Sequence, residues 1–440
     1  MEQTNYIVAI DLGTSHLVGM VGKKTAQGTL AILAEEVEGS ASCIRRGCVY
    51  NIEETAHRIN RLITKLQNKL SSKLPGFTIE KAYIGIGSQS LRSYKHKEVK
   101  IINTDSVVSE EDIHKLDEQC RAFKPDMLDV LGILPPTYYT KGTLTDTPAD
   151  IAQSAYYTKG TKTDNPVGIP CKRIEAHYRL IVGKPAIRNN IINSINRTKI
   201  KLAGIIVAPL ALADSIFSGD EKELGCALID FGAGVTAVVV YRQKELIHLS
   251  VIPLGGNLIT KDLTSLRLVE SDAEQLKITY GSAVLDKNRE NTDSFEARDG
   301  IGLHEINTVV EARAREMVDN VCAQIKSTGE IDALRTIVLA GGASALKNLP
   351  ELIHERFKKE VGFSTIRKEW MADPDARIGN PLYMTAISLL IKGTENCVFY
   401  EAPPVQPQPD PQPPIDNKEG VETEGGNFFD KLWKVIINTD

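Results

Sequence analysis

The sequence predicts an α/β protein built from two lobes. Its 440 residues exceed what one hydrophobic core usually serves. Strand-like runs alternate with helical patterns along most of the chain. One unit also occurs twice, at Asp11 and at Asp230: an apolar strand, an aspartate, a glycine-rich turn and a second strand. Together these observations favour an α/β chain with two or more lobes.

The composition is that of a soluble globular protein, with 42% hydrophobic and 25% charged residues. It excludes a collagen, a coiled-coil rod and a wholly disordered chain. The net charge of −5 gives no electrostatic reason to expect nucleic acid as a partner. Seven scattered cysteines without a CxxC motif predict reduced structural thiols in a cytosolic protein. We expect no signal peptide and no membrane-spanning helix, because no apolar run approaches roughly 20 residues.

The first half of the chain predicts a hairpin, further strands and two helices. Residues 52–70 show helical spacing of apolar residues, and Ser109 with Asp112 forms a capping signal. The elements expected here are strands at Tyr6–Asp11, His16–Val21, Leu30–Val37 and Lys81–Ile86, and helices at 52–70 and 109–123.

An internal repeat interrupts this pattern. The sequence YYTKGTLTDTP at 138–148 recurs as YYTKGTKTDNP at 156–166, with nine of eleven positions identical. Two copies are too few for a solenoid. We therefore predict a polar surface loop enlarged by tandem duplication.

The second half predicts three consecutive strands, then helices and one buried strand. Ser271 begins a capped helix, and residues 305–327 form a longer one. The remaining expected elements are strands at 174–183, 204–208, 226–230, 235–241, 245–252 and 336–340, a helix between 183 and 204, and a final helix at 381–391.

The C-terminal tail differs sharply from the rest. Seven of the 20 prolines fall in 403–414, and residues 401–440 carry the whole excess of negative charge. We expect an extended linker at 401–426 and an amphipathic helix at 427–440. A helix of about 15 Å could lie on a membrane but not span it. A partner's groove and packing onto the core are the alternatives. The side chains expected to contact lipid are Phe428, Phe429, Lys431, Leu432, Trp433, Lys434, Val435 and Ile436.

Three glycine-rich segments could bind a nucleotide. The turn after Asp11 and the turn after Asp230 each expose backbone N–H groups to phosphate oxygens, and an aspartate at a strand end suits a hydrated Mg²⁺. At Gly341-Gly342 a nucleoside could approach bare backbone. Each segment alone is equally compatible with an ordinary turn. Their order and spacing together favour the functional interpretation.

These segments resemble the phosphate and adenosine loops of the actin-like ATPase superfamily, and the chain is most similar to its FtsA family. The similarity runs through most of residues 5–393, in segments such as IVAIDLGTS, GSQSLRS, NPVGIP, IDFGAGVT, PLGGNLIT, KITYGSAV and VLAGGASAL. It implies an actin-like, two-lobed α/β fold that binds ATP and Mg²⁺, with an inserted FtsA-type subdomain and a flexible C-terminal tail.

The resemblance also implies roles for individual residues. Asp11 and Asp230 would hold Mg²⁺ through water, and Glu274 with Lys277 would hold the nucleoside. Without the family, Glu274 and Lys277 would be interpreted as a surface ion pair. The other nucleotide-binding residues implied are Gly13, Thr14 and Ser15 in the first loop; Gly232, Gly234, Val235 and Thr236 in the second; Gly255, Gly256 and Asn257; and Gly341, Gly342 and Ala343.

The second loop departs from the family pattern. Where relatives usually read GGGTTD, this chain reads GAGVTA, so that Ala237 stands in place of an aspartate. Loss of a carboxylate that could orient water or metal predicts nucleotide binding with at most slow hydrolysis. The sequence identifies no catalytic residue.

The resemblance implies a subdomain plan. The first lobe would comprise 1–80, 183–204 and 368–393, with the inserted subdomain at 81–182. The core of the second lobe would comprise 205–255 and 329–367, with a smaller subdomain at 256–328.

The function implied is that of a filament-forming protein at the cytoplasmic side of the inner membrane. It would tether the C-terminal peptide of the tubulin-like protein FtsZ at the division septum and contact other divisome proteins and copies of itself. Arg313 and Arg315 are candidates for that acidic peptide, although they also fit an ordinary exposed helix face. The alternatives are a pilus-type actin-like adaptor and a sugar kinase of the same superfamily.

Overall fold

The computed structural model describes residues 5–103, 107–142, 160–285, 296–298 and 301–400. The described residues form one compact unit. The linker and the amphipathic helix predicted at 401–440 lie outside the described residues, as does the centre of the duplicated segment.

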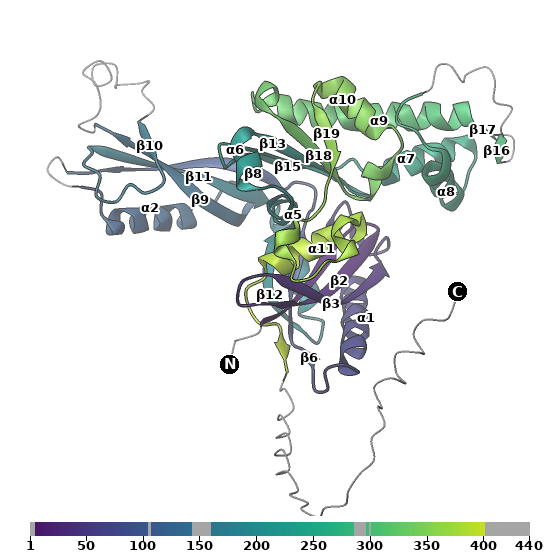
Figure 1. The fold of residues 1–440 in the computed structure, drawn as a ribbon, viewed down its shortest axis with the longest axis horizontal. Helices are drawn as coiled ribbons and strands as arrows, with labels where there is room; N and C mark the ends of the chain where they lie inside the picture. Colours follow the sequence, from purple (N-terminus) through teal and green to yellow (C-terminus); the bar gives the residue numbers. More distant parts are fainter. Residues whose placement is uncertain (1–4, 104–106, 143–159, 286–295, 299–300, 401–440) are drawn as a thin grey trace, which may run out of the picture. The chain divides into compact units, whose positions relative to one another are not determined.

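The first lobe contains a five-stranded sheet in the order β12-β7-β1-β2-β3 (Figure 1). Gly19 of β2 lies against Leu62 of α1, and Gly22 on the opposite face of β2 lies against Leu390 of α11. The two helices therefore cover opposite faces of this sheet. The elements are β1 (Asn5–Leu12), β2 (His16–Lys24), β3 (Leu30–Gly39), β7 (Lys81–Ile86), β12 (Lys201–Val207), α1 (Ile52–Ser71), α4 (Pro185–Ile195) and α11 (Pro381–Lys392).

The predicted helix at 52–70 is confirmed, and its limits have local causes. The side chain of Asn51 accepts a hydrogen bond from the Glu54 amide at 3.0 Å and caps the helix. Acidic residues occupy the first turn and Lys69 the last, which suits the helix dipole. The apolar stripe that includes Ile59 and Leu66 is buried against the sheet.

The second lobe contains the other half of the fold. Strands β13, β14, β15, β18 and β19 form part of a nine-stranded sheet in the order β10-β9-β11-β8-β15-β14-β13-β18-β19. The elements are β13 (Cys226–Phe231), β14 (Thr236–Arg242), β15 (Glu245–Ile252), β18 (Thr336–Ala340), β19 (Glu360–Phe363), α5 (Ala208–Ile216), α6 (Gly219–Leu224), α7 (Gly256–Leu263), α8 (Glu270–Tyr280), α9 (Leu303–Lys326) and α10 (Leu349–Phe357).

Alternate residues of β13 and β14 enter two different cores. One side faces the cluster that the second lobe shares with the first, and the other faces a cluster made with helices α7–α10. A strand buried on both faces reads as a continuous apolar run, which explains why CALIDF and TAVVVYR were recognisable in the sequence.

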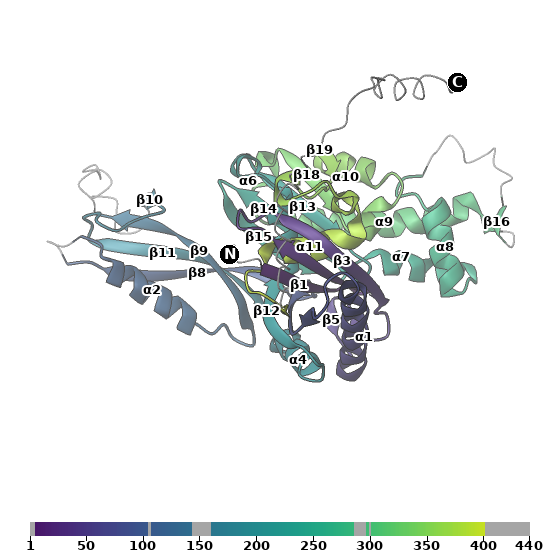
Figure 2. The same cartoon turned by 60° about the horizontal axis from the view of Figure 1, so that its bottom comes forward.

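The inserted subdomain forms the remainder of the large sheet. Its elements are β8 (Arg92–Ile101), α2 (Glu110–Ala122), β9 (Asp129–Lys141), β10 (Thr161–Thr163) and β11 (Arg173–Gly183). Figure 2 shows α2 lying along one face of these strands, where it encloses a separate core around Leu116, Ile174 and Tyr178. Because β7 pairs with β1 in the first sheet, the strands of the insertion begin at Arg92 rather than at residue 81.

The duplicated segment is not simply a polar loop, as the sequence had suggested. The first copy supplies the end of β9 and the second copy supplies β10, and the two pair antiparallel with Thr140 opposite Thr161 and Tyr139 opposite Lys162. Described residues of the two copies therefore form a hairpin with each other.

Three small two-stranded sheets and short 3-10 turns complete the fold. The strands are β4 (Ile44–Arg45) with β5 (Cys48–Val49), β6 (Thr78–Ile79) with β20 (Val398–Phe399), and β16 (Glu296–Arg298) with β17 (Ile301–Gly302). No disulfide joins the seven cysteines, all of which lie in the described ranges and six of which are buried. Within the described residues, no helix has the length and apolar character needed to cross a membrane.

Candidate functional site

Two hairpins of the same design provide the centre of the site. Asp11 is the last residue but one of β1, and Asp230 is the last but one of β13; each is followed by a short turn into an antiparallel partner. The turns contact each other, since a Cβ on Gly234 would lie only 2.6 Å from Oγ1 of Thr14. The structure thus brings the two predicted phosphate loops together across the lobes.

The two aspartates are an unneutralised pair. Burial raises the pKa of Asp11 to about 7, and the charge of Asp230 contributes to this shift. Burial likewise raises the pKa of Asp230 to about 6. Neither carboxylate forms a hydrogen bond or ion pair with another described residue. A pair of carboxylates that repel each other in a desolvated site would be stabilised by a cation.

Both turns offer backbone donors. In the described part of the chain, no hydrogen bond is donated by the amides of the three first-loop residues or of the three second-loop residues that follow Gly232. Three successive N–H groups in a tight turn form an anion-binding concavity. The residues concerned are Gly13, Thr14 and Ser15, and Ala233, Gly234 and Val235.

The first turn is held by a side chain that the sequence analysis missed. Ser40, which is fully buried, donates its hydroxyl to the Gly13 carbonyl at 2.6 Å, and its amide donates to the Ser15 carbonyl at 3.0 Å. The amide of Gly47 donates to Oγ1 of Thr14 at 3.0 Å. A lone serine beyond a strand carries no signal in a single sequence, so only the tertiary structure could reveal this contact.

The second turn is held by backbone. The amides of Gly256 and Asn257, at the start of α7, donate to the carbonyls of Gly232 at 3.0 Å and Ala233 at 2.8 Å. A Cβ on Gly255 would lie 2.5 Å from the Ala233 carbonyl oxygen, so only glycine fits there. The GGN segment therefore supports the loop with its main chain, while the Asn257 side chain is exposed.

Thr236 pairs with Phe231 and is buried on the opposite face of the sheet from Asp230, where it supports the second turn. It is 1% exposed, and its hydroxyl donates to the Leu254 carbonyl at 2.7 Å. That contact fixes the start of β14 against the segment that precedes α7.

Glu274 and Lys277 form more than a surface pair. Nζ of Lys277 lies 2.6 Å from Glu274, 2.8 Å from the hydroxyl of Thr260 and 3.3 Å from the carbonyl of Gly256. The Lys277 side chain is only 12% exposed. This network joins α8 to the start of α7 and thereby to the second loop, and Thr260 is a member that sequence reasoning missed.

The third glycine segment closes the site beside Asp230. Gly341 has φ +80, and a Cβ there would lie 2.3 Å from the Phe231 carbonyl and 2.4 Å from Oδ1 of Asp230. Gly342 faces open space and starts the 3-10 helix η3 (Gly342–Ala345) rather than an α-helix. Ala343 contacts Gly256, so this segment also adjoins the GGN loop.

These residues fit a magnesium nucleotide. Free amides suit phosphate oxygens, the two carboxylates suit a divalent cation, and the open side of Gly342 leaves room for a flat group. Among the described residues, no cluster of three or more His, Cys, Asp or Glu could ligate a metal by itself. A hydrated ion held by two carboxylates matches that donor set better than a fully protein-ligated one.

Ala237 lies directly opposite Asp230 in the β13–β14 pair and is 3% exposed. The aspartate usual at this position would thus stand beside Asp230.

Arg313 and Arg315 lie on α9, and both have acidic partners. Nε of Arg313 is 2.5 Å from Asp262, and that of Arg315 is 2.7 Å from Glu311. Hydrogen bonds to these carboxylates raise the pKa of both arginines.

A family model and several known proteins match this chain. Residues 227–388 fit the family described as "Cell division protein FtsA". The cell division protein FtsA of Porphyromonas gingivalis is 30% identical over 411 residues, which covers 91% of this chain and 81% of that protein. The chain belongs to the FtsA family.

Two further relatives carry the same description. The proteins of Bacillus subtilis and Pseudomonas aeruginosa are 26% and 28% identical, and the matches cover 89% and 90% of this chain and 84% and 91% of theirs. Among solved structures, the PilM-PilN type IV pilus biogenesis complex matches with a TM-score of 0.58 at 13% identity, covering 89% of this chain and 98% of that chain. At that identity the match shows the fold alone. The actin-like α/β fold predicted from the sequence is confirmed.

Proposed function

We propose that this chain is an ATP-binding, actin-like cell-division protein that polymerises on the cytoplasmic side of the inner membrane and tethers FtsZ to it at the division septum. Membership in the FtsA family supports this over the pilus-adaptor and sugar-kinase alternatives. The observation that carries the nucleotide part is the meeting of two amide-rich turns, each next to an unneutralised aspartate.

Each part of the site has a task in nucleotide binding. The free amides of the two turns would bind phosphate oxygens. The ionised carboxylates of Asp11 and Asp230 would hold a hydrated Mg²⁺. When bound, the cation neutralises phosphate charge. Lys277 would orient the nucleoside from α8, with Glu274 and Thr260 fixing its ammonium, and Gly341-Gly342 would border the base.

Hydrolysis should be slow. The carboxylate that Ala237 lacks would lie beside Asp230, where it could orient a water molecule or the metal. We expect near-stoichiometric ATP occupancy after gel filtration, with phosphate release well below one per minute. Ala237→Asp should raise phosphate release without weakening ATP binding. Fast release by the unaltered chain, or no ATP occupancy, would overturn this part of the proposal.

Membrane attachment is assigned to residues 427–440, on the basis of their sequence. Apolar residues such as Phe429 and Trp433 fall on one arc of a helical projection, and only Lys431 and Lys434 add positive charge. One copy should therefore bind lipid weakly, and polymerisation should strengthen attachment by gathering many tails.

Liposome flotation with ATP tests the anchor. The full chain is compared with a chain truncated after Gly426, and with a full chain carrying Trp433→Glu. Flotation of the unaltered chain alone supports the tether. If the truncated chain floats equally well, or if the full chain does not float, the assignment of the anchor fails.

The FtsZ-binding surface is proposed on α9. Because Asp262 and Glu311 already neutralise Arg313 and Arg315, an acidic peptide would have to compete with intramolecular carboxylates. Titration of the FtsZ C-terminal peptide against the Arg315→Gln and Glu311→Gln variants tests whether Arg315 binds the peptide. If Arg315 binds the peptide, the first change weakens binding and the second strengthens it. Unchanged affinity in both would remove α9 from the proposal.

A further inference from the structure

The two faces of the inserted subdomain have opposite character. On one face, Ile174, Ala176 and Tyr178 of β11 pack into the core that α2 covers. The residues between them point to the other face, because side chains alternate along a strand. No described helix packs on that face of β8, β11, β9 and β10.

The uncovered face is strongly positive. Cross-strand pairs place its cations next to each other, with Lys95 opposite Arg179, Lys97 opposite His177 and Arg173 opposite Lys141. We call this surface the cationic face. Its six cations are Lys95, Lys97, Lys141, Lys162, Arg173 and Arg179.

One buried carboxylate, that of Glu175, serves three of these cations. Nζ of Lys141 is 3.1 Å away, Nη2 of Arg173 is 2.8 Å away and Nζ of Lys97 is 3.7 Å away. Although burial opposes it, hydrogen bonds from His177 and Lys141 hold the pKa of Glu175 below its ordinary value. A single negative charge cannot balance three positive ones, so these four side chains together keep a net positive charge.

Two cations of the face have no direct ion pair in the described part of the chain, although the charge of Glu245 acts on one of them, Arg179. Lys95 and Arg179 form no hydrogen bond or ion pair there. Arg179 is partly buried, and burial lowers the pKa of its guanidinium, yet an arginine stays charged. A partly desolvated guanidinium that forms no direct ion pair, with only the charge of Glu245 acting on it, is suited to an incoming carboxylate.

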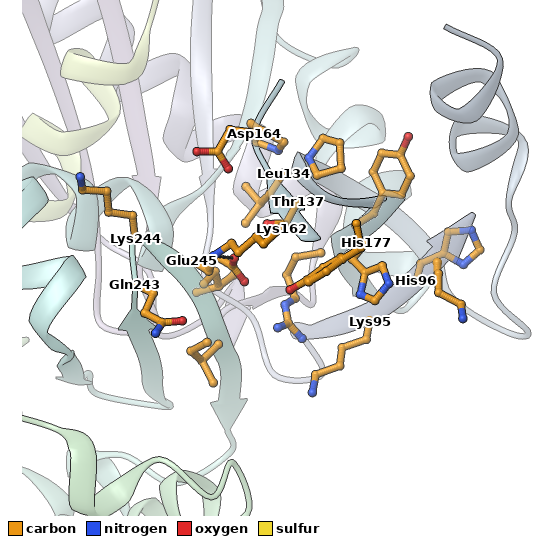
Figure 3. Close-up of a pocket in the computed structure, with 18 of the residues that line it drawn as sticks. Lys95, His96, Leu134, Thr137, Lys162, Asp164, His177, Gln243, Lys244 and Glu245 are labelled. Carbon is orange, nitrogen blue, oxygen red and sulfur yellow. Dashed lines mark hydrogen bonds and ion pairs between the residues drawn. The ribbon is translucent and has the colours of Figure 1, made fainter. Parts of the chain in front are cut away.

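The cationic face forms one wall of a groove of about 1370 Å³. Figure 3 shows Gln243 and Lys244, from the turn between β14 and β15, on the opposite side. Glu245 joins the two walls, because it is 2.6 Å from Nζ of Lys162 and accepts the Thr137 hydroxyl at 2.9 Å. The volume exceeds the roughly 300–1,000 Å³ of small-molecule pockets, which favours a polypeptide segment.

A free strand edge adjoins the groove. Strand β8 pairs with β11 along its whole length but meets β15 only where Arg92 lies opposite Ser250. In the described residues, the stretch from Ser93 to Ile101 therefore has one edge without a neighbouring strand. An extended peptide can add to such an edge by main-chain hydrogen bonds, with alternate side chains on one face.

We propose that this groove binds an extended acidic segment of a partner protein, which lies along β8 and carries Asp or Glu at alternate positions. The spacing follows from Lys95 and Lys97, which are two residues apart on one face of the strand. The concave shape disfavours a flat lipid surface. This inference concerns a surface separate from the nucleotide site and the C-terminal anchor.

Fluorescence anisotropy with the full chain tests the proposal. The probe is a labelled ten-residue peptide that alternates Thr and Glu, and the control peptide has five consecutive Thr followed by five consecutive Glu. The alternating peptide should bind at least fivefold more tightly, and its binding should weaken as salt rises. Absence of saturable binding, or equal binding of the two peptides, overturns the proposal.

Matched variants locate the binding. Lys95→Gln with Arg179→Gln should weaken binding at least tenfold, whereas Lys95→Arg should retain it. Lys115→Gln with Arg121→Gln removes the same charge from α2 and should change affinity less than twofold. Equal losses in the two double variants would show a non-specific charge effect and reject the groove.

One outcome would reassign the surface. If the peptide does not bind, and if only the Lys95/Arg179 double variant loses binding to phosphatidylserine vesicles, the cationic face contacts membrane and the peptide proposal is wrong. Thermal melting of each variant shows that the compared proteins are folded.

Discussion

The chain contains two kinds of β-hairpin. In β1–β2 and β13–β14 the turn is the part proposed to bind phosphate, and other elements fix its shape: Ser40 holds the first turn and the start of α7 holds the second. In β9–β10 the strands carry the contacts, and twenty residues separate the paired Thr140 and Thr161. An insertion in a turn that the rest of the molecule holds would break the contacts that fix its shape.

The duplicated hairpin also shows how the pairing register of β9 and β10 is kept after an insertion between them. Within one copy, YYT and the following TKT or TLT would pair around a two-residue Lys-Gly turn in the register that the structure has between the two copies. The duplication therefore adds 18 residues without changing the pairing register. The copies differ where Lys162 of the second aligns with Leu144 of the first, and only Lys162 can pair with Glu245.

The largest expected effect concerns the support of the second functional turn. Gly341→Ala should abolish nucleotide binding and cost about 3 kcal/mol, because φ +80 is strained for alanine and its Cβ would collide with Phe231 and Asp230. Gly342→Ala is the matched control and should cost under about 1 kcal/mol, since open space adjoins it. Urea unfolding and ATP titration measure both. Equal stabilities for the two variants would show that Gly341 is not tightly enclosed.

Next in size is the effect of the aspartate pair. Asp11→Asn should weaken Mg-ATP binding about 10- to 100-fold. It should also stabilise the metal-free chain at pH 7.5, on the order of 2 kcal/mol, because ionised Asp11 is desolvated and repelled by Asp230.

The stabilisation by Asp11→Asn should depend on pH, in a direction that the pKa of Asp11 determines. The pKa of Asp11 is about 7 in the folded chain against 3.8 ordinarily, so the folded state binds the proton more tightly. Metal-free stability should therefore rise as pH falls from about 7 toward 4, and D11N should flatten this rise. Thermal melts in EDTA across that range provide the measurement. A D11N chain with an unchanged pH profile would contradict the assignment.

A smaller effect distinguishes side-chain from backbone support. Ser40→Ala removes the hydroxyl that donates to the Gly13 carbonyl. It should lower the free energy of unfolding by about 1 kcal/mol. It should also weaken ATP binding about three- to tenfold, which corresponds to about 1 kcal/mol of binding free energy. Asn257→Ala should change affinity less than twofold, because that residue supports its loop through its amide. Isothermal titration of ATP into both variants measures the two affinities. If Asn257→Ala is the more damaging change, the two turns are not held in these different ways.

The smallest effect is expected in the third hairpin. Deletion of 143–160 or of 146–163 removes 18 residues and restores the two-residue turn, but only the first keeps Lys162. Both should fold, with a gain of up to about 2 kcal/mol from the shorter loop. The first should be more stable by about 0.2–1 kcal/mol through the pair with Glu245. Unfolding of the subdomain in either deletion would refute the shared register.

Sequence patterns predicted the elements whose buried residues recur at regular intervals, or in one apolar run, along the chain. The helix at 52–70 and the strands at 226–230 and 336–340 are amphipathic or wholly apolar, and the structure has them within one or two residues. Strand β8 was missed because RSYKHKEVKI is polar on its open face and exposed at its edge. Strand β9 was missed because Pro135 and Pro136 interrupt it; they lie at a bulge, where His177 pairs with Thr137 and Arg179 with Leu134.

The sequence by itself determined the two Asp–glycine turns, their order and the fold they imply, because tight turns and buried strands depend on neighbours along the chain. Only the tertiary structure decided that Thr14 meets Gly234, that Ser40 and α7 hold the two turns, and that Lys277 reaches Gly256 through Thr260. It also decided which faces stay uncovered, as in the cationic groove. Such contacts join residues tens to hundreds of positions apart, and their chemistry depends on burial and distance, which no local pattern encodes.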